Sequence, residues 1–205
     1  MIKIGILSLQ GDIAEHISIM EKAMQKTGLK GSVFGVKTKD AVATLDALVI
    51  PGGESTTMCK LLDHYKIGEE IAGLAKKGTP ILGTCAGLVI LSKSGCHEVT
   101  KTRQKLLGLI DIEVERNAFG RQKQSFEAEL EIPVLGKEKY PAVFIRAPSI
   151  KKVGKDVSVL ARYEDKIVAA QKDKLIVLAF HPELTGDTRM HEYFLKLIKN
   201  NEKHS

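Results

Sequence analysis

The chain has 205 residues, 43% of them hydrophobic and 27% charged, which predicts a single globular domain over residues 1–205. No apolar run approaches the ~18 residues that a membrane-spanning helix needs, so no membrane association is expected. The net charge of +6 comes from scattered lysines, with only 5% aromatic residues and no RNA-binding signature, which argues against a nucleic-acid partner.

The first half of the chain alternates between apolar runs and helical patterns. Residues 2–9 form an apolar run typical of a central parallel strand, and a helix is expected from residue 13 until Gly28. Further strands are expected at 32–36, 47–50 and 81–82, and further helices begin near 55, 67 and 88, the first of them capped by Ser55 or Thr56. This order predicts a doubly wound, flavodoxin-like α/β sandwich of three layers, with sites at the carboxyl ends of its mainly parallel strands.

The second half of the chain has a different period. Apolar and charged residues alternate at 110–115 and 126–132, which indicates a small antiparallel extension with one solvent-exposed face. A short strand is expected at 143–145, a meander over 157–161, 167–170 and 175–180, and a last helix over 188–199 with Asp187 as its N-cap. The stretch Lys101–Lys105 is interpreted as a solvated loop, and the end Lys203–Ser205 as frayed.

Cys85 lies in the middle of Gly83-Thr84-Cys85-Ala86-Gly87, between an apolar strand and the start of an apolar helix. This is the sulfur version of the Gly-x-Ser-x-Gly nucleophile elbow, a sharp strand-to-helix turn that exposes a nucleophile. The flanking glycines leave out Cβ atoms that would crowd the turn. On this stretch alone, a buried structural cysteine is an equally good interpretation.

The other two cysteines, Cys59 and Cys96, are interpreted as packing residues. Three cysteines at unrelated spacings predict neither a disulfide framework nor a metal site, and no cofactor is expected. The start, Met1-Ile2-Lys3-Ile4, enters a strand directly and shows no signal-peptide pattern. A reducing, cytoplasmic location is therefore expected.

His181 is the candidate base for a Cys85 nucleophile, because it directly follows the most apolar strand. Pro182 biases the local backbone to be extended, so that His181 and Glu183, two residues apart, are expected to face one site. Cys85 would attack, His181 would move the proton, and Glu183 would hold the imidazole. A surface histidine beside a proline turn is the alternative. The five other histidines fall in expected helices, a polar loop or the tail: His16, His64, His97, His191 and His204.

An acyl transfer also needs backbone N–H groups that stabilise the developing oxyanion. The N–H of Ala86, directly after the nucleophile, is one expected donor. The turn Pro51-Gly52-Gly53-Glu54-Ser55 is expected to supply the second donor at Gly53, because two glycines let the backbone approach a substrate closely. A plain turn is the alternative for this motif.

Taken together, these motifs resemble those of class I, triad-type glutamine amidotransferases, and the matching stretches are Pro51–Met58, Gly83–Gly87 and His181–Glu183. Other stretches resemble the glutaminase subunits of pyridoxal 5′-phosphate synthase in particular: Leu9–Asp12, Glu115–Gln122, Ser125–Glu127, Phe144–Pro148 and Phe180–Thr185. The resemblance covers nearly the whole chain, in order and at compatible spacings. Residues 93–105 match no motif.

The resemblance implies hydrolysis of L-glutamine to L-glutamate and ammonia through a γ-glutamyl thioester on Cys85. The ammonia would pass, inside a large hetero-oligomer, to a synthase (lyase) subunit that builds pyridoxal 5′-phosphate from a pentose phosphate and a triose phosphate. Gln10 is then a candidate sensor of that partner. Carried over by position, the residues that would hold glutamine are Gly53, Glu54, Ser55, Arg116, Ile145 and Arg146. Arginines and a carboxylate suit the charged ends of an amino acid.

Three other interpretations stay open at this point. One is the glutaminase subunit of another pathway, such as imidazole glycerol phosphate synthesis, which would share the triad but not the stretches 116–122 and 145–148. The second is a free-standing cysteine hydrolase or protease, which would not need the glutamine-holding residues. The third is a non-catalytic, partner-binding module with a vestigial triad, against which the intact Cys85, His181 and Glu183 argue.

Overall fold

The structure of the protein, a computed structural model, describes residues 1–120 and 124–199. Within these residues ten strands form one sheet, in the order β2-β1-β3-β4-β12-β11-β9-β6-β5, with β10 paired to β11. The first five strands in this order are parallel: β2 (Gly31–Val36), β1 (Ile2–Leu7), β3 (Ala47–Ile50), β4 (Ile81–Thr84) and β12 (Leu175–Leu178). The expectations for Arg121, Gln122 and Lys203–Ser205 lie outside the described residues.

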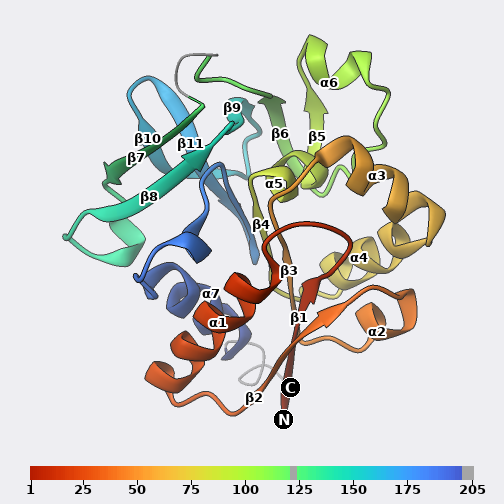
Figure 1. Ribbon diagram of the computed structural model, residues 1–205, viewed down its shortest axis with the longest axis vertical. Helices are drawn as coiled ribbons and strands as arrows, with labels where there is room; N and C mark the ends of the chain where they lie inside the picture. Colours follow the sequence, from red (N-terminus) through yellow and green to blue (C-terminus); the bar gives the residue numbers. More distant parts are fainter. Residues whose placement is uncertain (121–123, 200–205) are drawn as a thin grey trace.

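The parallel strands are the core of the molecule. Every residue of β3, β4 and β12 is buried, which explains their continuous apolar sequences. Helices lie on both sides of these strands (Figure 1). On one side α1 (Ile13–Thr27) packs against α7 (Arg189–Lys199), and on the other lie α2 (Lys39–Ala43), α3 (Ser55–His64) and α4 (Ile67–Lys76). The predicted three-layer α/β sandwich is confirmed.

Beyond β12 the sheet becomes mixed. The predicted meander is confirmed, because β10 (Ser158–Tyr163), β11 (Lys166–Lys172) and β12 pair antiparallel in succession. The sheet continues through β9 (Ser149–Val153) and β6 (Ile110–Glu115) to β5 (Ser92–Gly95). Of the two stretches predicted to form a small antiparallel extension, only 126–132 does so, in a separate pair of β7 (Ser125–Leu130) with β8 (Tyr140–Ile145). The other stretch, 110–115, is β6 of the main sheet, where it pairs antiparallel with β9.

Aromatic side chains join this small pair to the main sheet. The rings of Phe126 and Phe144 stack with centroids 4.7 Å apart, and Phe144 lies edge-on to Phe180 at 5.7 Å. Phe180 precedes His181 in the chain, and the N–H of His181 donates to the carbonyl of Val143 at 2.8 Å. The packing therefore fixes the end of β8 against the segment that follows β12.

Among the α-helices and strands of the described residues, two helices and two strands were not predicted: α2, α6 (His97–Lys101), β5 and β9. The two helices have only five residues each, too few to show a helical period. β5 is polar, and the second half of β9 is exposed, so neither shows an apolar run. The first strand also ends at Leu7 rather than Leu9, because the chain turns from Ser8 onward.

The strand order explains where a site is expected. β2 and β3 lie on opposite sides of β1, so the chain changes direction across the sheet at β1. In such folds the site lies at this switch point, outside the carboxyl ends of the strands. The turns after β1, β3, β4 and β12 all meet there. Across residues 1–120 and 124–199, the structure has no helix with the length and apolar character that a membrane crossing requires.

Candidate active site

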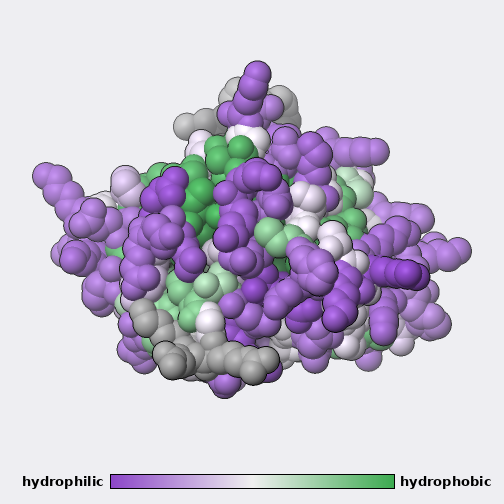
Figure 2. Space-filling view, turned by 90° about the horizontal axis from the view of Figure 1, so that it is seen from above, coloured by the Kyte–Doolittle hydropathy of each residue, from purple (hydrophilic) through white to green (hydrophobic). Residues whose placement is uncertain are grey.

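The carboxyl edge of the parallel strands carries a cavity of about 760 Å³. Viewed from that edge, the surface is mostly hydrophilic, with hydrophobic patches exposed between the polar side chains (Figure 2). Segments that follow four neighbouring strands line the cavity, with Gln10 after β1, Gly53 after β3, Cys85 after β4 and His181 after β12. Residues that are far apart in sequence thus meet at the predicted edge.

Cys85 occupies a strained turn between β4 and α5 (Ala86–Leu91). Its φ of 47° and ψ of −99° are rare for a residue with a side chain and cost about 1–3 kcal/mol. The turn is fixed by the Cys85 N–H, which donates to the Leu178 carbonyl on β12 at 2.8 Å. A Cβ atom on Gly87 would overlap the carbonyl oxygen of Ile50. The geometry is that of a nucleophile elbow, with the thiol half-exposed at the cavity.

His181 and Glu183 form a buried pair beside this thiol. His181 Nδ1 lies 2.6 Å from Glu183 Oε1, and both residues are at most 6% exposed. The two side chains meet as predicted, but the reason differs. The chain after His181 is not extended; it turns through the 3₁₀ segment Pro182–Leu184, and this turn brings the carboxylate back to the ring. Gly52 makes room for the imidazole, since a Cβ there would lie 2.5 Å from His181 Cε1.

The electrostatics of this pair favour a charged imidazolium. Burial by itself would lower the pKa of His181, but hydrogen bonds with Cys85 and Glu183 outweigh it and raise the pKa to about 10. Burial would raise the pKa of Glu183, but contacts with His16 and His181 outweigh it and lower the pKa to about 2. The arrangement is therefore a charged imidazolium held by a carboxylate, next to the Cys85 thiol.

His16, which the sequence analysis assigned only to a helix, lies directly behind the pair. Its Nε2 lies 3.4 Å from Glu183 Oε2 and 3.3 Å from Thr84 Oγ1, and all three residues are buried. His191 from α7 lies next to it, with ring centroids 6.5 Å apart. Burial and the nearby His16 lower the pKa of His191 to about 3, so this ring is neutral. The spacing of α1 predicted its buried face, but not that this face reaches the end of β4.

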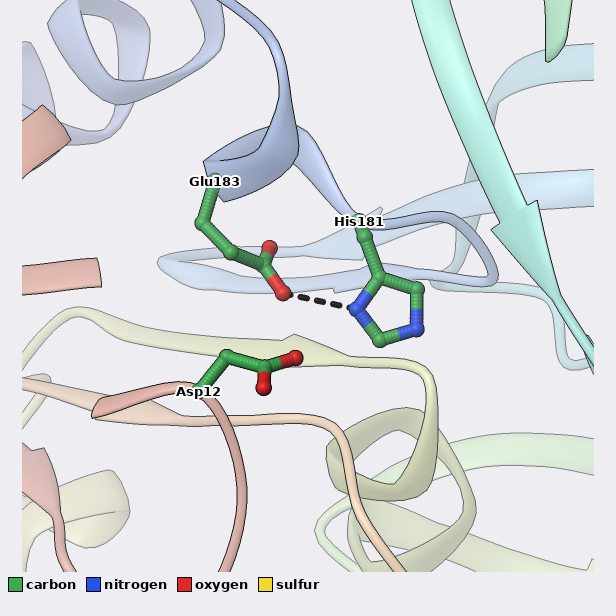
Figure 3. A group of neighbouring side chains, drawn as sticks. All are labelled: Asp12, His181 and Glu183. Atoms are coloured by element: carbon green, nitrogen blue, oxygen red, sulfur yellow. Dashed lines mark hydrogen bonds and ion pairs between the residues drawn. The ribbon is translucent and has the colours of Figure 1, made fainter. Parts of the chain in front are cut away.

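Asp12 brings a second carboxylate to the same place. Figure 3 shows its side chain turned toward His181 and Glu183 from the start of α1. The three side chains offer ligand atoms within 4.8 Å of one another, and they are the group that could hold a cation. His181 Nδ1 and Glu183 Oε1 are already paired at 2.6 Å. A metal bound there would therefore compete with the hydrogen bond that orients His181.

The chain matches the model of the SNO glutamine amidotransferase family over residues 6–200. It belongs to this family. A relative from Archaeoglobus fulgidus, named pyridoxal 5′-phosphate synthase subunit PdxT, is 51% identical over 195 residues, covering 95% of this chain and 98% of the relative. A protein of the same name from Methanocella arvoryzae is 53% identical over 196 residues, covering 96% and 97% of the two chains.

Solved structures agree with the family assignment. A crystal structure of a glutamine amidotransferase superposes with a TM-score of 0.84 at 41% identity, covering 96% of this chain and 98% of that one. A putative GMP synthase subunit from Thermoplasma acidophilum superposes with a TM-score of 0.64 at 14% identity, covering 99% and 96%. The second likeness shows that the fold is shared with more distant proteins.

The cavity brings together the residues that the resemblance to the family singled out. Two of them, Arg116 and Arg146, directly follow β6 and β8, as predicted. Glu183 is not at the surface of the cavity, because it lies behind His181. The cavity is lined by these predicted residues: Gln10, Gly53, Glu54, Ser55, Cys85, Ala86, Arg116, Ile145, Arg146 and His181. It is also lined by Asp12 and Asn117, which lie in matching stretches but were given no role, and by Glu98 and Gln124, which lie in none.

Glu54 joins the start of α3 to Arg116. Its carboxylate accepts from the N–H groups of Thr56 at 3.1 Å and Thr57 at 2.7 Å, and Arg116 Nη2 donates to it at 3.3 Å. Burial would raise the pKa of Glu54, but these backbone donors outweigh it and lower the pKa to about 2. The helix is thus capped by Glu54, and the predicted caps, Ser55 and Thr56, are wrong. Glutamate rarely caps a helix through its own side chain, so the pattern favoured the hydroxyl residues.

Ser55 contacts the segment that matched no motif. It is 3% exposed, and its Oγ donates to Gln104 Oε1 at 3.1 Å. The predicted solvated loop is largely confirmed around Lys105, which is exposed and pairs with Asp63 at 2.7 Å, but Gln104 turns inward. The Ser55 side chain is therefore already engaged, and its backbone is what remains for a substrate.

The other two cysteines lie apart from the triad. Cys59 on α3 is 3% exposed, and burial together with the negative charge of Glu54 raises the pKa of its thiol to about 11. This agrees with a packing role. Cys96 is half-buried and donates a hydrogen bond to Glu113 Oε1 at 3.4 Å, so it does more than fill space. The three cysteines are free thiols.

Proposed function

We propose that this chain is the glutaminase subunit of a pyridoxal 5′-phosphate synthase, a single amidotransferase domain over residues 1–205 acting in the cytoplasm. It would hydrolyse L-glutamine and deliver the ammonia to a synthase (lyase) subunit within a large hetero-oligomer. The observation that carries the proposal is the Cys85 thiol beside the buried His181–Glu183 pair, at one end of a cavity lined by Glu54, Arg116 and Arg146.

In the proposed reaction Cys85 and His181 form the thiolate–imidazolium pair. The thiolate attacks the γ-carboxamide carbon of glutamine, and the resulting oxyanion accepts from the N–H groups of Gly53 and Ala86. His181 then gives its proton to the amide nitrogen, the C–N bond breaks, and ammonia leaves a γ-glutamyl thioester on Cys85. His181 next removes a proton from water, whose attack releases glutamate and restores the thiolate. Glu183 stays ionised and orients His181 throughout.

The other end of the cavity suits the amino-acid head of the substrate. Arg116 would bind the α-carboxylate as a charge-assisted donor, and Glu54 would bind the ammonium. Arg146 and the backbone of Gly53, Ser55 and Ile145 complete the proposed set. The Ile145 carbonyl lies 3.9 Å from the Cys85 sulfur, which supports a position beside the bound substrate.

Gln10 contacts the turn after β3 that carries Gly53, the proposed oxyanion donor, and this contact supports its role as a sensor of the partner. Its side-chain Oε1 accepts from the backbone N–H of Glu54 at 3.2 Å, next to Gly53. A partner that moves Gln10 would therefore change the backbone that carries the proposed oxyanion donor. A Gln10→Ala variant is expected to lose stimulation by the synthase subunit; full stimulation in that variant would remove Gln10 as a sensor.

The test is a glutamine analogue that carries a chloromethyl ketone in place of the carboxamide, added to the complex with the cognate synthase subunit. We expect alkylation of Cys85 and not of Cys59 or Cys96, as mapped by peptide mass spectrometry, with protection by L-glutamine. The analogue with one methylene fewer serves as the control and should react slowly. Equal labelling of the three cysteines, or labelling that glutamine does not prevent, would overturn the proposal.

A further inference from the structure

His16 is placed so that it can hold the Glu183 carboxylate. Glu183 uses Oε1 for His181, at 2.6 Å, and its Oε2 is buried with no hydrogen-bond partner among residues 1–120 and 124–199. The polar atom that faces Oε2 is His16 Nε2, at 3.4 Å. A buried carboxylate oxygen that loses its last polar neighbour is strongly disfavoured, so this contact matters even though it is long.

The proton position on His16 follows from its neighbours. A carboxylate only accepts, so a favourable contact requires that Nε2 carries the hydrogen. The same nitrogen lies 3.3 Å from Thr84 Oγ1, whose hydroxyl can share that hydrogen. Thr84 directly precedes Cys85, and its side chain is 0% exposed. The contacts therefore run from the nucleophile through His181, Glu183, His16 and Thr84 back to the nucleophile's own chain segment.

We propose that His16 is a positioning residue that holds the Glu183 carboxylate, and through it the His181 ring, in the orientation that hydrolysis needs. The inference rests on the proposed function. His16 does not touch the cavity, so it acts on the turnover step rather than on substrate binding. Groups that orient the ligands of metal sites typically change metal affinity or activity by about 10- to 100-fold when removed, and we expect an effect of this size for His16.

The matched control is His191. It is as buried as His16 and lies beside it, but its ring nitrogens have no hydrogen-bond partner among the described residues. Replacing either histidine by leucine removes a buried imidazole of the same size, whereas only the His16 change removes the polar atom that faces Glu183 Oε2. A purely structural role for His16 would make the two replacements alike.

The experiment measures kcat and KM for glutamine hydrolysis by the complex with the synthase subunit, with active sites counted by titration with the chloromethyl ketone analogue. His16→Leu should lower kcat by about 10- to 100-fold and leave KM within about 2-fold. His16→Gln should recover most of the rate, because its amide nitrogen reaches the place of Nε2, whereas the shorter His16→Asn should not. His191→Leu should keep kcat within about 3-fold of the unmodified chain.

Each outcome of this experiment either supports or overturns the inference about His16. Wild-type kcat in His16→Leu would overturn the inference, and so would equal losses in His16→Leu and His191→Leu. If His16→Leu does not fold, the comparison of Gln with Asn at this position replaces it, and equal rates in those two would overturn the inference. Hydrolysis by a Cys85→Ala chain would overturn the proposed function itself, which separates the two failures.

Discussion

The inner and outer ends of the cavity are built differently. The inner end consists of a half-buried thiol, Cys85, and three buried side chains, His181, Glu183 and His16. Its residues follow β4 and β12 or lie on α1, and His181 and Glu183 are paired at 2.6 Å. The outer end, Glu54, Arg116 and Arg146, lies on loops; the side chain of Glu54 is 44% exposed and that of Arg116 is 25% exposed. In the proposed function, the chemistry would take place on the buried, strand-supported part of the molecule, and substrate recognition on the exposed loops.

The comparison predicts that changes at the inner end act on kcat. The largest effect is expected for Cys85→Ala, which removes the nucleophile and should lower kcat by about 10⁴-fold or more. Glutamine binding should persist in this variant, because the outer end is intact, and calorimetric titration would detect it. Loss of binding together with activity would show that the two ends are not separate.

A smaller loss of kcat is expected when only the negative charge of Glu183, which orients His181, is removed. Glu183→Gln should lower kcat by about 10²- to 10⁴-fold, as the imidazole loses its anionic partner. The same change should lower the pKa of His181, because the Glu183 hydrogen bond and charge are among the causes that raise it. Imidazole NMR titration measures this shift. An unchanged His181 titration would contradict the role given to Glu183.

At the outer end the effect should appear in KM. Arg116→Ala removes a charged donor to the substrate carboxylate and should raise KM by about 10- to 100-fold with kcat nearly unchanged. Arg162→Ala, an exposed arginine on β10, is the control and should change neither constant. A fall in kcat equal to the rise in KM would place Arg116 in the chemistry instead.

The smallest effect concerns stability at low pH. The pKa of Glu54 is lowered from 4.5 to about 2 in the folded protein, so its contribution is present above pH 4.5 and is lost as the pH falls toward 2. Glu54→Gln should therefore unfold more easily than the unmodified chain at pH 6, and the difference should shrink toward pH 2.5. Urea unfolding at several pH values measures it. A stability difference between the two chains that grows as the pH falls would contradict the predicted direction.

The difference between the two ends also explains what the sequence could predict. The proximity of the proposed triad residues could be predicted because Cys85 and His181 each follow a continuous apolar strand, and such strands can be recognised without a structure. His16 was missed because the helical pattern of α1 predicts that this histidine is buried but does not predict which residues the buried face contacts. Its contact with Glu183 joins segments 167 residues apart in sequence, and only the packing of α1 brings them together.

The outer end was found by resemblance rather than by pattern. A lone arginine after a strand, such as Arg116, is indistinguishable from a surface charge until its partner Glu54 is known. Two contacts could not be predicted: the capping of α3 by Glu54 and the hydrogen bond of Gln104 with Ser55. Both depend on the conformations that long, flexible side chains adopt in the folded protein. Patterns of burial predict strands well and side-chain partners poorly.

The most direct test of the account is the release of glutamate from L-glutamine by the purified chain, measured with and without the cognate synthase subunit and beside Cys85→Ala. The account predicts hydrolysis that rises when the synthase subunit is added and disappears in Cys85→Ala. Hydrolysis that continues without Cys85, or none in a folded and associated complex, would contradict it.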